Sequence, residues 1–358
     1  MCSSDLTGIN FRCQHLTHYS LAGGAKRDYP ASIINHSPWW PYYKGVEDYF
    51  ARLSYMLTRG KPVRDVLVIH PIESAWGLLT PGSNQAAPKL GELEQSLRTV
   101  MFTLTGQHYD WDFGDEGLLA RYGHVTADGL TVGQMSYKLV VVPPVVTLRK
   151  STIKLLNAFV AAGGKVLFAG EQPARCDGKE CADAALLRLL DSSANCDAEP
   201  AALTRQVESL LPRQVSLQVD GKECDQVWAM LRQVDEGYLL FVQSHERKQP
   251  LKLEVRVAGA SLPIVLWDAA TGEKTLLAGQ ADSEGGFVLL DLPSTGSVLL
   301  SYGIDVPDAV PNKPAPKVVS WKAIEGPFEY ELTELNSFPL DYCDYSIEGS
   351  AYSELKPT

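Results

Sequence analysis

The chain has 358 residues, 45% hydrophobic and 21% charged, and this length predicts two or three cores because single domains rarely exceed about 250 residues. The net charge of −11 argues against nucleic acid as a partner, since binding to the phosphate backbone requires a basic face. No apolar run reaches the ~18 residues that cross a bilayer, and MCSSDLTGINF does not resemble a signal peptide. Neither a membrane anchor nor an export signal is expected.

The first sixty residues are typical of the end of a larger domain. A short strand leads into a loop, residues 15–43, that is rich in polar and aromatic side chains. Sugars pack their apolar faces on Trp and Tyr rings, and Arg, Asp and His bond their hydroxyl groups. We therefore predict that this loop binds carbohydrate at the mouth of a barrel. The candidate residues are His18, Tyr19, Arg27, Asp28, Trp39 and Trp40. A structural alternative for the two tryptophans is that they plug the barrel end against the next domain.

The segment VEDYFARLSYMLTRG predicts an amphipathic packing helix that ends at Gly60. Glu47 and Asp48 lie in its first turn, where carboxylates suit the helix dipole better than they suit catalysis. VRDVLVIHP then predicts a buried parallel strand, followed by a polar loop. Glu73 and Trp76 in this loop are further candidates for substrate binding, because they can turn toward the barrel mouth.

Strands and helices alternate from Pro62 to about residue 170. Four apolar strands, in VRDVLVIHP, HYDWDFG, YKLVVVPPV and KVLFAG, are separated by amphipathic helices. This order predicts a doubly wound, flavodoxin-like sheet, with any ligand at the carboxyl ends of the strands. Asp115 and Glu116 lie at one such end and are expected to form a solvated acidic tip. No glycine fingerprint follows the first strand, so no nucleotide cofactor is expected.

The seven cysteines do not have the spacing of a metal module. Cys176 and Cys181, in CDGKEC, could form a local disulfide or hold a metal, but free thiols are the favoured interpretation. No metal site and no other cofactor are predicted.

Residues 171–212 predict short helices and polar loops, and from Val215 the hydrophobic period falls to two. Alternating strands with turns such as DEG and SEGG predict an antiparallel β-sandwich. Four prolines in residues 306–319 indicate a stiff linker, and WKAIEGPFEYELTELNSFPLDYCDYSIEG is typical of the start of another β domain. Both ends of the chain therefore suggest a fragment of a longer protein.

Several of these segments together resemble one family. HLTHYSLAGGAKRDYP, HSPWWPYY, EDYFARLSYMLTRGKPVRDVLVIHPIESAW and YKLVVVPPV with AFVAAGGKVLFAG are similar to the multidomain α-L-rhamnosidase-like enzymes of glycoside hydrolase family 106. The flavodoxin-like part also resembles the trimerisation domain of family 42 β-galactosidases, which leaves a homo-oligomer open. The resemblance implies a secreted or periplasmic bacterial parent.

The resemblance implies a multidomain α/β plus all-β architecture. Its parts would be the end of a catalytic TIM barrel, a flavodoxin-like domain of trimerisation type, a β-sandwich, a linker and the start of a sugar-binding-type β-sandwich. The expected boundaries are 1–60, 61–212, 213–304, 305–319 and 320–358.

The implied activity is hydrolysis of terminal sugars of polysaccharides by two carboxylates. Those acids would precede this sequence, so we assign no catalytic residue and expect the chain alone to be inactive. A non-catalytic carbohydrate-binding module and a family 42 β-galactosidase-like enzyme are the alternatives. An amidotransferase-like hydrolase is disfavoured, because no Cys lies at a strand-to-helix elbow.

Overall fold

The computed structural model describes residues 33–35, 37–79, 88–181, 183–235, 237–312, 319–331, 342–354 and 356–357. The chain divides into two compact units. Arg52–Asn312 belong to the first unit, and Phe11–Ala51 with Lys313–Thr358 form the second. Among the described residues no helix combines the length and the apolar character needed to cross a membrane.

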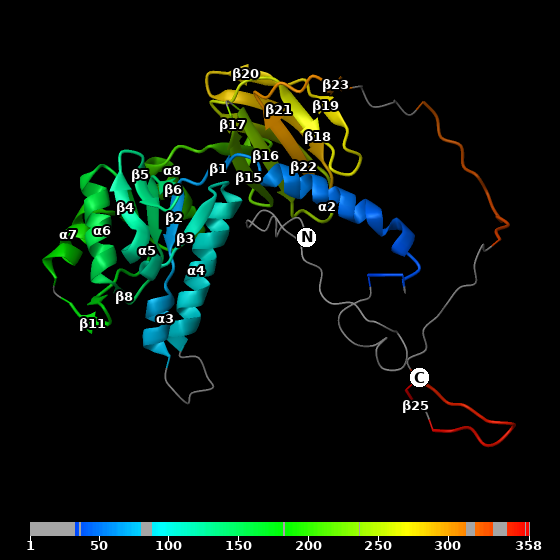
Figure 1. Cartoon of the computed structure of the whole chain (residues 1–358), viewed down its shortest axis with the longest axis horizontal. Coiled ribbons are helices and arrows are strands. Elements are labelled where there is room, and N and C mark those ends of the chain that lie inside the picture. The colour runs from blue at the N-terminus through cyan, green and yellow to red at the C-terminus, as the bar shows by residue number, and fades with distance from the viewer. Residues whose placement is uncertain are drawn as a thin grey trace. The chain divides into compact units, whose positions relative to one another are not determined.

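A five-stranded parallel sheet forms the first half of the larger unit (Figure 1). Its spatial order is β12-β9-β7-β2-β3, which in chain order is 2-1-3-4-5, the order found in flavodoxin. The fifth strand is β12, in a segment where the sequence predicted only short helices and loops. The strands are β2 (Val66–Ile69), β3 (Trp111–Gly114), β7 (Leu139–Val142), β9 (Lys165–Ala169) and β12 (Ala194–Cys196).

Alternate residues of these strands face two separate cores. Leu67 and Ile69 of β2 join one cluster with α5, α6 and α7, whereas Val66 and Val68 join a second cluster with α4 and α8. All four side chains are at most 1% exposed, and full burial stabilises each by about 1.5–3 kcal/mol. Figure 1 shows α6 and α4 on opposite sides of the sheet. The helices are α4 (Pro88–Gly106), α5 (Glu116–Tyr122), α6 (Lys150–Ala161), α7 (Ala184–Ser192) and α8 (Pro200–Leu210).

The polar loop predicted after β2 is in fact helix α3 (Ile72–Leu78). Its buried Ser74 accepts hydrogen bonds through Oγ from the backbone nitrogens of Val146, at 2.9 Å, and Thr147, at 3.2 Å. Because these partners are more than seventy residues away, local sequence did not reveal the helix. Thr147 belongs to β8 (Thr147–Leu148), one strand of a small three-stranded sheet.

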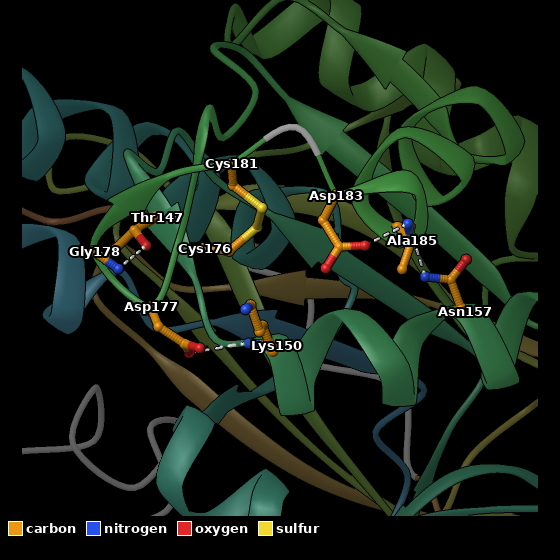
Figure 2. The surroundings of a disulfide bond; sticks show 9 residues. All are labelled: Thr147, Lys150, Asn157, Cys176, Asp177, Gly178, Cys181, Asp183 and Ala185. Carbon is orange, nitrogen blue, oxygen red and sulfur yellow. Dashed lines mark hydrogen bonds between the residues drawn. A yellow bond between two sulfur atoms is a disulfide. The ribbon is translucent and has the colours of Figure 1, made fainter.

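Cys176 and Cys181 form a disulfide, so the expectation of free thiols is wrong (Figure 2). Cys176 ends β10 (Arg175–Cys176), which pairs with β11 (Lys179–Glu180). Asp177 and Gly178 between these strands have φ of 49° and 77°, as a tight two-residue hairpin turn requires. The hairpin brings the Cα atoms of the two cysteines to 5.5 Å, within disulfide range.

The same hairpin is tied to the neighbouring elements (Figure 2). The Gly178 nitrogen donates to Thr147 Oγ1 at 2.9 Å, and Asp177 Oδ1 accepts from the Lys150 nitrogen at 3.1 Å. The second bond satisfies a free N–H in the first turn of α6. A further bond in Figure 2 joins Asp183 to the Ala185 nitrogen and caps α7. The bonds of Asp177 and Gly178 hold the disulfide hairpin against β8 and the start of α6.

A β-sandwich forms the second half of the larger unit. Its core includes Leu217 and Val255 from one sheet and Leu240 and Leu300 from the other, and each of the four is fully buried. One sheet contains β14 (Lys222–Glu223), β13 (Val215–Val219), β17 (Leu251–Ala258), β21 (Gly285–Leu292) and β20 (Gln280–Asp282). The other contains β1 (Lys61–Pro62), β15 (Val227–Val234), β16 (Gly237–Ser244), β22 (Ser297–Tyr302), β18 (Ile264–Trp267), β19 (Lys274–Leu276) and β23 (Val310–Pro311).

Strand β23 lies inside the segment predicted to be a linker. It pairs in parallel with β19, and Lys274 of β19 forms an ion pair with Asp308. Within the second unit, β24 (Tyr342–Cys343) pairs with β25 (Lys356–Pro357). The helix predicted after residue 45 is α2 (Tyr43–Leu57), which runs through the boundary between the units.

Candidate functional site

The predicted carbohydrate-binding loop is described only in part. His18, Tyr19, Arg27 and Asp28 lie outside the described residues, so their role stays a prediction. Trp39 and Trp40 are described, and Trp40 begins the short 3-10 helix η2 (Trp40–Tyr42).

The two tryptophans pack on Tyr43, the first residue of α2. Trp40 stacks on the Tyr43 ring with centroids 5.8 Å apart and planes 18° apart, whereas Trp39 is tilted at 5.7 Å. Trp39 is 44% exposed and Trp40 is 40% exposed. Offset stacking restrains a ring without burying it. This aromatic cluster therefore presents flat apolar faces of the kind that pack against sugar rings.

Glu73 and Trp76 lie on helix α3, immediately after the carboxyl end of β2. The Glu73 carboxylate forms an ion pair with the guanidinium of Arg149, which directly precedes α6. Trp76, one turn further along α3, is 60% exposed. The structure thus brings Glu73 to an arginine that the sequence analysis did not single out.

Asp115 and Glu116 do not form a solvated tip. Asp115 caps α5, because its Oδ1 accepts from the Leu118 nitrogen at 2.8 Å. Glu116 is only 2% exposed, and its Oε2 accepts from the Arg149 nitrogen at 2.8 Å. Burial raises the pKa of the Glu116 carboxyl. The prediction failed because α5 begins at Glu116 and directs this side chain inward.

The carboxyl edge of the parallel sheet is therefore closed by bonds within the protein. Ser74 secures one segment, and Arg149 joins Glu73 through its guanidinium and Glu116 through its backbone nitrogen. In open α/β sheets this edge usually holds the ligand. Here Glu73, Ser74 and Glu116 already bond neighbouring protein groups, which indicates that these side chains stabilise the fold.

A second polar cluster, which the sequence analysis missed, lies at the opposite ends of β2 and β3. Arg64 donates from Nε to Asp110 at 3.0 Å and from Nη1 to Asp112 at 2.9 Å, and Tyr137 Oη donates to Asp112 at 2.9 Å. Burial raises the pKa of Asp110 to about 6, although Arg64 opposes the shift. Asp110 and Asp112 flank Trp111, and this spacing places both side chains on one side of the strand. Arg64 lies 46 residues before Asp110, so local sequence did not connect it with the two aspartates.

The described residues include no cluster of three or more His, Cys, Asp or Glu side chains with the arrangement of a metal site. The candidate surfaces are thus built from aromatic rings, carboxylates and arginines. Such surfaces bind polar organic ligands through stacking and hydrogen bonds.

Two solved structures with a similar fold carry the names of carbohydrate-cleaving enzymes. The chain is similar to a rhamnosidase from Novosphingobium sp. PP1Y, with a TM-score of 0.58 and 15% identity over 81% of this chain and 27% of that chain. It is also similar to Gan42B, a family 42 β-galactosidase from G. stearothermophilus, with a TM-score of 0.50 and 13% identity over 75% of this chain and 45% of that chain. The fold is therefore that of glycoside hydrolase domains with α/β and β-sandwich parts.

The family model for α-L-rhamnosidases, glycoside hydrolase family 106, matches residues 23–278. The chain belongs to this family, as the sequence resemblance predicted. A putative β-glucuronidase from Formosa agariphila is 22% identical over 92% of this chain. The chain spans 27% of the length of that relative and 27% of the Novosphingobium rhamnosidase.

Proposed function

We propose that this chain is part of an α-L-rhamnosidase-like glycoside hydrolase that cleaves terminal sugars from polysaccharides with two carboxylates. In this proposal the chain supplies a sugar-binding wall and structural domains, and the catalytic carboxylates belong to a part of the parent outside this sequence. The family match over residues 23–278 carries the proposal. The small share of each relative that the chain spans supports the placement of the acids elsewhere.

The described carboxylates also support this placement. Glycoside hydrolysis requires two acids that face one glycosidic bond, about 5–10 Å apart. Glu73 and Glu116 both bond Arg149, and Glu116 is buried away from solvent. Asp110 and Asp112 share Arg64. Each pair is held by its arginine, so we assign neither to catalysis.

In the proposed arrangement, residues 1–60 complete a TIM barrel, 61–212 form a flavodoxin-like domain and 213–304 form a sandwich. Residues 305–319 lead to a further sugar-binding-type domain that starts at about residue 320. The rings of Trp39 and Trp40 would bind the substrate, as would His18, Tyr19, Arg27, Asp28, Glu73 and Trp76. The disulfide supports a secreted or periplasmic parent, since such bonds persist mainly in oxidising compartments.

Hydrolysis of 4-nitrophenyl α-L-rhamnoside by the purified chain tests the placement of the catalytic acids. We expect no release of nitrophenol above the buffer rate, with an active α-L-rhamnosidase as the positive control. Binding of the same compound, measured by calorimetry, should weaken on Trp40→Ala. Release of nitrophenol that disappears in Glu73→Gln or Asp28→Asn, and persists in the surface control Glu94→Gln, would overturn the proposal.

A further inference from the structure

A cavity of about 370 Å³ lies between the parallel-sheet part and the sandwich of the larger unit. Its walls come from α4, β3 and β15, and they include the rings of Phe102, Trp111, Phe113 and Trp228. Small-molecule sites usually enclose about 300–1,000 Å³, so this volume suits a ligand of one or two sugar rings.

The rings around the cavity form two pairs. Phe102 and Trp228 face each other across the two parts with centroids 6.0 Å apart, and Trp111 meets Phe113 edge-on at 4.9 Å. Phe102 is 52% exposed and Phe113 is 44% exposed. Large apolar side chains exposed in a concave site commonly mark a place where a ligand binds.

Charged groups line the same cavity. Arg64, Asp110 and Asp112 all contribute to its wall. The Arg64 guanidinium bonds both carboxylates, and Arg232 also interacts electrostatically with Asp110, so the cluster has no excess positive charge. Carboxylates and arginine bond sugar hydroxyl groups well, whereas an anionic ligand would meet two carboxylates whose partner Arg64 is already engaged.

The cavity is preformed by bonds beneath it. His108, which also lines it, has a fully buried side chain and bonds Glu223 of β14 through Nδ1 at 2.8 Å. His108 Nε2 lies 3.0 Å from the Val227 carbonyl oxygen, at the start of β15. His245 packs under the Trp228 ring with centroids 4.1 Å apart. These contacts hold the two walls in place before a ligand binds, which lowers the ordering cost of binding.

We propose that this cavity binds a neutral saccharide of one or two units, at a site that shares no residue with the aromatic cluster around Trp39 and Trp40. The rings supply stacking faces, and the Arg64 cluster supplies hydrogen-bond partners for hydroxyl groups. The inference goes beyond the proposed function, because such binding requires no cleavage and holds whichever part of the parent carries the catalytic acids.

Fluorine NMR of the whole chain labelled with 5-fluorotryptophan tests the site, because the seven tryptophans give separate reporters. The probes are methyl glycosides of rhamnose, galactose and glucose, with methyl glucuronide as the charged partner of the glucoside. We expect at least one neutral glycoside to shift the Trp228 and Trp111 signals with a Kd of roughly 1 mM. The glucuronide should bind about tenfold more weakly than the glucoside if the glucoside binds. The Trp39 signal reports separately on the proposed substrate surface.

Matched variants locate the binding. Phe102→Ala should weaken it about tenfold, and Trp228→Phe, which keeps a ring, should retain part of it. Tyr122→Ala is the control, because Tyr122 is 59% exposed on α5 and does not line the cavity. Three results would overturn the proposal. The first is unchanged Trp228 and Trp111 signals with every glycoside, and the second is binding by Phe102→Ala as tight as that of the wild type. The third is a cavity that binds the apolar compound indole but none of the glycosides.

Discussion

Two regions of the larger unit differ in how their polar groups are used. At the carboxyl edge of the parallel sheet, Glu73, Ser74 and Glu116 bond neighbouring groups, and Glu116 is buried. In the cavity between the sheet and the sandwich, Arg64 and its two aspartates line an open space together with exposed rings. Both regions contain carboxylates and an arginine, but in the second a cavity of about 370 Å³ lies beside them.

This difference shows that topology alone does not locate a ligand site. A doubly wound sheet usually binds ligands at its carboxyl edge, but the packing of α3 and α6 closes that edge in this protein. The space arises instead where α4 meets the first strands of the sandwich. A second domain packed against a sheet can therefore create a site that the sheet does not supply by itself.

The largest expected effect comes from the hydrogen-bonded pair of His108 and Glu223 that supports the cavity. Glu223→Ala would leave His108 buried without its carboxylate, and loss of one partner of a buried pair costs about 3–5 kcal/mol. Urea unfolding followed by circular dichroism measures the change. Glu94→Ala, which breaks an exposed pair with Arg98, is the control and should cost below about 1 kcal/mol. Equal costs in the two variants would contradict the supporting role of the pair.

The pH dependence of stability tests the Arg64 cluster. Burial raises the pKa of Asp110 to about 6 against an ordinary value of 3.8, despite the opposing effect of Arg64. The neutral carboxyl is therefore favoured in the folded state, so its contribution is complete below pH 3.8 and is lost as pH rises through 6. Relative to Asp110→Asn, the wild type should lose about 2 kcal/mol between pH 4 and pH 7. Parallel stability curves for the two proteins would show that Asp110 is not perturbed.

At the closed edge, Glu116→Ala should destabilise the protein by about 2 kcal/mol, since the change leaves the Arg149 nitrogen without its acceptor in a partly buried place. Asp115→Ala, which removes the adjacent cap, should cost about 1 kcal/mol. Thermal unfolding of both variants gives the order. A Glu116 variant as stable as wild type would indicate that the edge is less tightly bonded than we describe.

A comparably small effect should come from the disulfide, whose hairpin bonds Thr147 and Lys150 beside the closed edge. The double variant Cys176→Ser/Cys181→Ser should lose about 1–2 kcal/mol, because the bond closes a short loop. Cys196→Ser, at a free and partly buried thiol, is the control and should be nearly neutral. Saccharide binding at the cavity should be unchanged in the double variant, and a loss of binding there would show that the two features are coupled.

Sequence patterns predicted four of the five strands of the parallel sheet, because runs such as Val66–Ile69 are continuously apolar and the helices have clear periodicity. Strand β12 (Ala194–Cys196) was missed because it has no such run. Helix α3 was missed because distant backbone groups bond Ser74. The Asp-Gly pair at 177–178 is a local signal for the hairpin that joins the two cysteines, and the prediction of free thiols did not take it into account. Glu116 was misjudged because its burial depends on tertiary packing.

The candidate site was less predictable than the fold. The aromatic segment around Trp39 and Trp40 was identified from composition, and its rings are exposed as a binding surface requires. The cavity could not be predicted, since Arg64, Asp110 and Trp228 come from three distant segments. The pairing of β2 with β3 brings Arg64 to Asp110, and the packing of the sandwich against α4 adds Trp228.

Hydrogen–deuterium exchange with and without the tightest-binding neutral methyl glycoside tests the contrast between the two regions most directly. We predict slower exchange in residues 101–113 and 227–229, which contain most of the cavity lining, and no change in residues 70–76 and 145–150 at the closed edge. Protection confined to the closed edge, with none around the cavity, would contradict the account.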